Sequence, residues 1–128
     1  MAPVILLDTH VVLWVYTGKV ERLSPRAVQE IQASTLATSP IVELELAYLN
    51  EVGRVTDSAS QILGALASRV GLTVAQVGFG PVCATAAGIT WTRDPFDRML
   101  AAHSLTAGLP LCTKDTTLLE NLDRAFWD

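Results

Sequence analysis

The chain has 128 residues, of which 50% are hydrophobic and 17% are charged, a composition typical of a globular protein and unlike that of a disordered chain. Its formal net charge of −4 has the wrong sign for a protein that binds a polyanion through bulk electrostatics. A nucleic-acid enzyme whose acidic residues surround metal ions is still compatible with this charge, because the cations change the local field. One domain covering residues 1–128 is expected.

The elements alternate between strands and helices along the chain. Val4–Leu7 is a continuous apolar run, typical of a strand buried on both faces of a parallel sheet, and it ends at Asp8. The further expected elements are an amphipathic segment over 11–16, a helix from Ser24-Pro25 to about Ala33, a strand over 35–38, a helix capped by Ser39-Pro40, a helix over 59–70 closed by Gly71, a strand over 72–77, a helix over 81–89, a helix over 94–107 closed by Gly108, a strand over 109–112 and a short strand over 124–127. This alternation predicts an α/β fold in which a mainly parallel sheet carries helices on both faces.

Residues 70–92 carry no charged side chain, which raises the question of a membrane span. Glycines and Pro81 interrupt this stretch, so a buried strand followed by a helix is favoured. The amino-terminal Met-Ala-Pro-Val lacks the basic region of a signal peptide. Cys83 and Cys112 have neither zinc-site nor disulfide spacing and are expected to be small buried residues. A soluble cytoplasmic protein without membrane association is predicted.

Two acids mark the start of the helix over 94–107. Asp94 occupies the N-cap position before Pro95, and Asp97 follows in the first turn, where a negative charge is favoured by the helix dipole. A helix cap and an acid that compensates the helix dipole would explain this pair on structural grounds. However, further acids stand at other strand ends and helix starts of the chain, and together they favour a functional site.

Asp8 and Asp115 each follow a predicted strand, whereas Glu43 and Asp97 lie in the first turns of predicted helices. Glu43 stands one residue too late for a capping box, so local structure explains it poorly. In open α/β sheets, ligands bind beyond the carboxyl ends of the strands, where the strand order reverses. The four acids are therefore expected to converge there. Glu45 is predicted to be an ordinary solvated charge.

Several carboxylates in one pocket repel each other unless cations occupy it. Oxygen ligands without a cysteine or histidine cluster select Mg²⁺ or Mn²⁺ rather than zinc. A cation held in this way binds a phosphate oxygen and generates hydroxide from water, so the pattern predicts hydrolysis of a phosphodiester. Arg93, Arg98 and Lys114 flank the acids and are candidates for positioning phosphates, although each is equally compatible with a plain surface charge.

Four segments carry a resemblance to a known family. Leu-Leu-Asp8-Thr-His, Ser39-Pro-Ile-Val-Glu43-Leu, Trp91-Thr-Arg-Asp-Pro-Phe-Asp97-Arg-Met-Leu-Ala-Ala and Cys112-Thr-Lys-Asp115 resemble, in order, the PIN-domain signature, and in particular that of the VapC toxins of toxin–antitoxin pairs. The third segment is the most specific. The resemblance implies a three-layer α/β/α sandwich, a Mg²⁺- or Mn²⁺-dependent endoribonuclease, a cognate antitoxin whose C-terminal arm blocks the site, and a homodimer.

The same resemblance implies roles for individual residues. Asp8, Glu43, Asp97 and Asp115 match the family's acidic quartet. Of these, Asp8 and Asp97 are expected to ligate the metal, and the other two to ligate it directly or through water. Asp94 is interpreted mainly as the helix cap, with contact to the site or RNA as a lesser role. Thr113 matches a hydroxyl that would orient an acid or a phosphate.

The histidines and tryptophans have simpler interpretations. His10 fits either the rim of the site or an exposed loop, and His103 is interpreted as packing. Trp14, Trp91 and Trp127 could stack on bases, but tryptophans scattered among apolar neighbours are more typical of a core or an interface.

Two other functions stay open. Another phosphate-ester hydrolase could use Asp8 as a nucleophile, although a second acid would then be expected two residues later, where His10 stands. A catalytically silent interaction module would keep the fold and bind a partner through apolar surface, but it would have no use for four mutually repelling acids. The sequence leaves open which RNA is cut, and whether one or two metal ions are bound.

Overall fold

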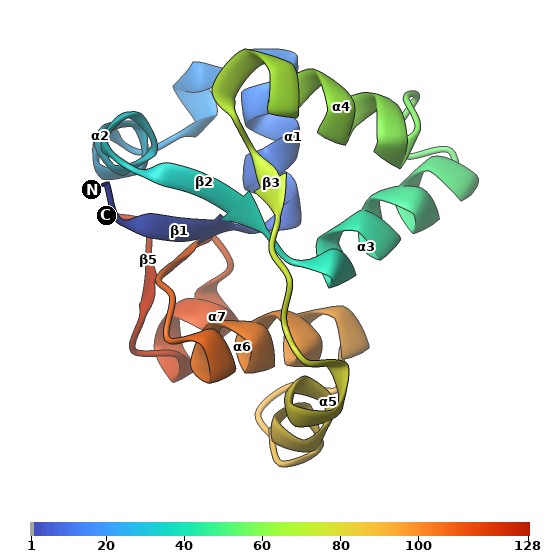
Figure 1. Ribbon diagram of the computed structural model, residues 1–128, viewed down its shortest axis with the longest axis vertical. Helices are drawn as coiled ribbons and strands as arrows, with labels where there is room; N and C mark the ends of the chain where they lie inside the picture. The colour runs from blue at the N-terminus through green and yellow to red at the C-terminus, as the bar shows by residue number, and fades with distance from the viewer. Residues whose placement is uncertain (1) are drawn as a thin grey trace.

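The computed structural model describes residues 2–128, so Met1 of the predicted 1–128 domain lies outside the described residues. Within this range the strands form one parallel sheet of order β3-β2-β1-β4-β5 (Figure 1). The strands are β1 (Val4–Leu7), β2 (Thr35–Thr38), β3 (Thr73–Val74), β4 (Leu111–Cys112) and β5 (Ala125–Phe126). The predicted α/β class with a mainly parallel sheet is confirmed.

Helices cover both faces of this sheet. They are α1 (Thr9–Thr17), α2 (Pro25–Ala33), α3 (Pro40–Glu51), α4 (Ala59–Val70), α5 (Phe79–Ala87), α6 (Pro95–Ala107) and α7 (Thr116–Asn121), with a short 3-10 helix η1 (Val20–Arg22) between α1 and α2. Figure 1 shows α1 and α4 on one side of the sheet, and α6 and α7 on the other. Helix α5 packs against α6 on the side away from the sheet. The three layers agree with the predicted α/β/α sandwich.

Helix starts follow the local chemistry of their first residues. Ser24, Ser39 and Asp94 cap α2, α3 and α6 by accepting backbone N–H groups, and a proline follows each of them at the first helical position. Helices α4 and α6 end at Gly71 and Gly108, both in the left-handed conformation that glycine adopts without strain. These predicted boundaries are confirmed.

Other boundaries differ from the prediction. The strand expected over 72–77 pairs only at Thr73–Val74, because β3 is an edge strand with β2 as its single neighbour. Helix α5 begins at Phe79, two residues before Pro81, since proline is tolerated within the first turn. Helix α7 was not predicted, because its six residues are too few to show helical periodicity.

The uncharged stretch 70–92 contains β3 and α5, in agreement with the predicted strand and helix. No helix within residues 2–128 is both long enough and apolar enough to cross a membrane. Cys112 is buried in β4 and Cys83 is half-buried on α5, and both are free thiols.

The strand order reverses beside β1, which has β2 on one side and β4 on the other. The chain passes from β1 outward to β3, then crosses back to β4 and β5. Leu7 and Cys112, the last residues of β1 and β4, are partners in the sheet register and are fully buried. The residues that follow them, Asp8 and Thr113, therefore emerge side by side at the carboxyl edge, where open α/β sheets bind ligands.

Candidate active site

A cleft of about 400 Å³ opens at this edge of the sheet. It is lined by residues from the ends of β1 and β4 and from α1, α3 and α6, namely Asp8, His10, Trp14, Glu45, Asp94, Asp97, Lys114 and Asp115. Five of these side chains are carboxylates, so residues distant in the sequence form one acidic cleft.

Asp8 is the most enclosed of these acids, with 8% of its surface exposed. Its Oδ1 accepts the N–H of Thr9 at 2.6 Å, which caps α1, and its Oδ2 accepts the hydroxyl of Thr113 at 2.6 Å. Burial raises the pKa of the Asp8 carboxyl, and the hydrogen bond from Thr113 opposes that rise. Both oxygens of Asp8 are thus held in fixed positions.

Thr113 connects two of the acids. Its buried hydroxyl donates to Asp8 and accepts the backbone N–H of Asp115 at 3.0 Å. The Oδ1 of Asp115 in turn accepts the N–H of Leu118 at 3.0 Å and caps α7. The hydroxyl expected to orient an acid therefore contacts Asp8, at the edge where β1 and β4 end.

Asp97 lies half-buried in the first turn of α6. The Oδ1 of Asp94 accepts the N–H groups of Phe96, at 2.8 Å, and of Asp97, at 3.3 Å, so Asp94 is the predicted cap and also lines the cleft. Burial first, and then the charges of Asp94, Asp115, Asp8 and Glu45 in that order, raise the pKa of Asp97 to about 7. The acids are thus close enough for their charges to influence one another.

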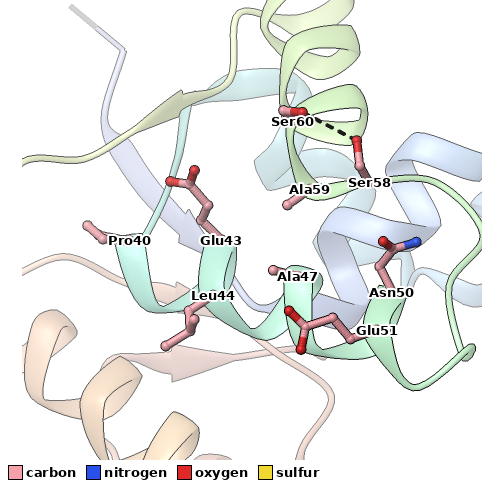
Figure 2. Close-up of a pocket in the computed structure, with 9 residues that line it drawn as sticks. All are labelled: Pro40, Glu43, Leu44, Ala47, Asn50, Glu51, Ser58, Ala59 and Ser60. Carbon is pink, nitrogen blue, oxygen red and sulfur yellow. Dashed lines mark hydrogen bonds between the residues drawn. The ribbon is translucent and has the colours of Figure 1, made fainter.

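Glu45, not Glu43, is the glutamate in this cleft, and the prediction is corrected here. The half-buried Glu45 carboxylate accepts the hydroxyl of the buried Thr9, and burial raises the pKa of Glu45. Glu43 is exposed and faces a different groove between α3 and α4, where it lies among the labelled residues of Figure 2. Glu45 is therefore not the solvated charge that was predicted.

The periodicity of α3 explains this difference. Residues two apart in a helix project about 200° from each other, so Glu43 and Glu45 occupy nearly opposite faces. Val42, Leu46 and Leu49 form the buried stripe of α3, and Glu45 falls within that stripe at helical spacing. A charged residue inside an apolar stripe was the sequence signal that could have identified it.

Of the three basic residues predicted as candidates for phosphate binding, only some lie at the cleft. Arg98 donates to the carbonyl groups of Ala86 and Ala87, both at 3.2 Å, and so binds the C-terminal end of α5. Arg93 is exposed and does not line the cleft. Lys114 is exposed and does line it. Arg98 consequently has a structural role, and its contact with a phosphate stays a prediction.

The two histidines lie in different environments. His10 is exposed and lines the cleft, so it lies at the rim. His103 is 1% exposed inside α6, in agreement with its interpretation as packing, and its Nδ1 lies 2.7 Å from the hydroxyl of Ser39. Of the tryptophans, Trp14 lines the cleft and Trp127 is buried behind it.

The donor chemistry of the cleft fits a hard divalent cation. The five carboxylates offer oxygen ligands. Burial and then the neighbouring acids raise the pKa of Asp97, so its ionised form is unfavourable and a cation would stabilise it. Among residues 2–128, no three acidic, histidine or cysteine side chains are already arranged as a complete metal site. The residues that would hold the ion are Asp8, Glu45, Asp97 and Asp115.

Comparison with known proteins gives three kinds of similarity. The sequence pattern of the PIN domain matches residues 5–124. The chain is 37% identical over 118 residues to ribonuclease VapC22 of Mycobacterium tuberculosis, a match that covers 89% of this chain and 88% of that protein. The PIN-domain match includes the segments that carry Asp8, Glu45, Asp97 and Asp115.

Solved structures share the fold at low sequence identity. A toxin–antitoxin complex from Klebsiella pneumoniae gives a TM-score of 0.66 at 15% identity, covering 95% of both chains. VapBC2 from Rickettsia felis, bound to a DNA fragment from its promoter, gives 0.63 at 15% identity, covering 98% of this chain and 99% of that one. VapBC-1 from Haemophilus influenzae gives 0.55 at 17% identity, covering 98% and 96%.

Proposed function

The chain belongs to the PIN-domain family, and from this premise we propose that it is a metal-dependent endoribonuclease that acts as the toxin of a toxin–antitoxin pair. The observation that carries the proposal is the cleft at the switch in strand order, where five carboxylates from distant parts of the chain meet. Similarity to a ribonuclease over 89% of the chain supports the choice of RNA as the substrate.

In this proposal Asp8, Glu45, Asp97 and Asp115 hold Mg²⁺ or Mn²⁺ directly or through water. When bound, the ion supplies an activated water as the nucleophile and neutralises charge on the phosphate. The chain's part is to keep the carboxylates in place: Thr113 fixes Asp8 and the backbone of Asp115, and Thr9 fixes Glu45. Such partners of the ligands restrict their orientation and raise metal affinity.

We also propose a cognate antitoxin and a homodimer as partners. The structural neighbours described as toxin–antitoxin complexes support the antitoxin. Exposed apolar side chains support a protein partner of either kind, since Leu44 and Phe79, 58% and 76% exposed, line one groove between α3 and α5. Size-exclusion chromatography with light scattering of the purified chain, alone and with the candidate antitoxin, tests both partners.

The decisive experiment is cleavage of total RNA by the antitoxin-free protein with Mg²⁺ or Mn²⁺, with and without EDTA. Asp97→Asn and Glu45→Gln are expected to lower cleavage at least a hundredfold, because each removes a charged oxygen ligand. Glu43→Gln is the matched control, since it makes the same charge change on the same helix outside the cleft, and it should retain activity.

Equal loss in Glu43→Gln and Glu45→Gln would contradict the assignment of Glu45. Absence of cleavage by folded, metal-replete protein across transfer, ribosomal and messenger RNA would favour the catalytically silent module instead. Phosphate trapped covalently on Asp8 would favour a phosphate-ester hydrolase with a different mechanism.

A further inference from the structure

One wall of the acidic cleft is aromatic and basic. The rings of His10 and Trp14 lie with their centroids 6.1 Å apart at an angle of 47°, and the Nζ of Lys114 lies 5.9 Å from the centroid of Trp14. All three residues line the same cleft as the five carboxylates. We call His10, Trp14 and Lys114 together the aromatic wall.

Trp14 joins this wall to the core. Its ring packs against that of the buried Trp127, with centroids 5.9 Å apart at 57°, while Trp14 itself is only half-buried. Packing on Trp127 and on the core holds the indole in place, and the side chain also lines the cleft. An immobilised aromatic face beside charged groups is suited to stacking.

The charges of the cleft also restrict where a nucleic-acid strand can bind. A phosphodiester chain that enters a cleft lined by five carboxylates meets repulsion wherever no cation intervenes. Among the lining residues, Lys114 supplies the positive charge, and it belongs to the aromatic wall. A polyanion would therefore be held most favourably along this side of the cleft.

We propose that the aromatic wall binds an unpaired nucleotide adjacent to the scissile phosphate. The base stacks on the Trp14 ring with His10 at its edge, and the Lys114 ammonium contacts a backbone phosphate. This inference rests on the proposed ribonuclease function and assigns the position of one nucleotide to these three side chains. In a duplex the bases are already stacked and paired, so their faces cannot reach the wall.

The test measures binding separately from cleavage. Fluorescence anisotropy of a labelled single-stranded 12-nucleotide RNA, and of the same strand in a duplex, is recorded on the Asp97→Asn protein with Mg²⁺. In that background Trp14→Leu should weaken single-strand binding about tenfold or more, because it removes the aromatic face on which a base stacks. Trp14→Phe keeps an aromatic face and should stay within about threefold. The duplex should bind more weakly than the single strand and respond little to either change.

Two further variants keep the test independent of core packing. His10→Ala, at an exposed position, should weaken single-strand binding several-fold, and Lys114→Gln should weaken it and reduce its salt dependence by about one phosphate contact. Lys19→Gln is the matched control, since Lys19 is exposed and lies outside the acidic cleft, and it should bind as the parent does.

Unchanged single-strand binding in both His10→Ala and folded Trp14→Leu would overturn the inference, as would equal affinity for the duplex. These results leave the proposed function intact if the wild-type protein cleaves RNA. Conversely, weakened binding in the wall variants without any cleavage by the wild type would support the wall and overturn the proposed nuclease activity.

Discussion

Asp8, Asp94 and Asp115 each have two roles in this molecule. Each side chain accepts a backbone N–H in the first turn of its helix, and each also lines the acidic cleft. An N-cap fixes the carboxylate at low conformational cost, and the partial positive charge of the helix start offsets some of the repulsion between acids. Asparagine also caps helices, so Asp→Asn changes separate catalysis from stability better than Asp→Ala changes do.

Thr113 provides a test of this positioning. Thr113→Val keeps the shape of the side chain but removes the hydroxyl that donates to Asp8 Oδ2 and accepts from Asp115 N–H. Because that hydrogen bond lowers the pKa of Asp8, its loss should raise this pKa further and weaken Mn²⁺ binding and cleavage by about 10–100-fold. Calorimetric titration of Mn²⁺ and an RNA cleavage assay measure the two effects.

Thr113→Ser is the control, because it restores the hydroxyl while losing the methyl group. It should recover most of the metal affinity. If the valine and serine variants bind Mn²⁺ equally, the hydroxyl does not position the acids.

At the scale of elements, α3 and α6 carry Glu45 and Asp97 and are joined by a buried hydrogen bond. His103 of α6 places Nδ1 at 2.7 Å from the hydroxyl of Ser39, the cap of α3, and its Nε2 has no hydrogen-bond partner within residues 2–128. Burial lowers the pKa of His103, so the neutral imidazole is the form that the fold accommodates. The contact fixes the start of α3 relative to α6.

This buried histidine predicts a pH dependence of stability. A folded-state pKa below the unfolded value of about 6.5 means that the unfolded chain takes up the proton first on acidification. The contribution of His103 is therefore present above pH 6.5 and is lost as the pH falls towards its lowered folded-state pKa. Urea unfolding between pH 5 and 8 should show this loss in the wild type relative to His103→Asn, which keeps a polar group near the Nδ1 position. A constant difference between the two proteins across that range would contradict the prediction.

The sequence was sufficient to predict most elements because their signals are local. Proline after a serine or aspartate cap marks the starts of α2, α3 and α6, and the apolar run of β1 needs no partner to be identified. Helix α7 has a local cap in Asp115, but its six residues are too few to show helical periodicity. The boundaries of edge strand β3 depend on its pairing with β2, which is a tertiary contact.

The candidate site was predictable only in part, because some of its contacts are not specified by local sequence patterns. Strand ends and helix starts place Asp8, Asp97 and Asp115 at one edge by topology alone. The choice between Glu43 and Glu45 depends on the rotation of α3 against the sheet. The hydrogen bond between Thr113 and Asp8 spans 105 positions in the sequence, and no local pattern specifies such a contact.

For the molecule as a whole, the acidic cleft opposes folding at neutral pH. The formal charge is −4, yet five carboxylates are concentrated in one cleft. The folded-state pKa of Asp97, about 7, is well above its ordinary value of 3.8. A raised pKa means that this group contributes stability below about pH 3.8 and that the contribution is lost as the pH rises through about 7.

Metal-free wild-type protein should consequently lose stability relative to Asp97→Asn between pH 5.5 and 8.5. Because Asp97 is half-buried and partly screened by solvent, we expect a difference of about 1 kcal/mol, or roughly 3–5 °C in the thermal unfolding midpoint. Mg²⁺ binds the ionised carboxylates and should restore the wild-type midpoint at pH 8.5 more than at pH 5.5, with little effect on Asp97→Asn. Differential scanning calorimetry with EDTA or Mg²⁺ at both pH values measures this. If Mg²⁺ raised both midpoints equally, the ion would be binding elsewhere, and the repulsion in the cleft would not be what it relieves.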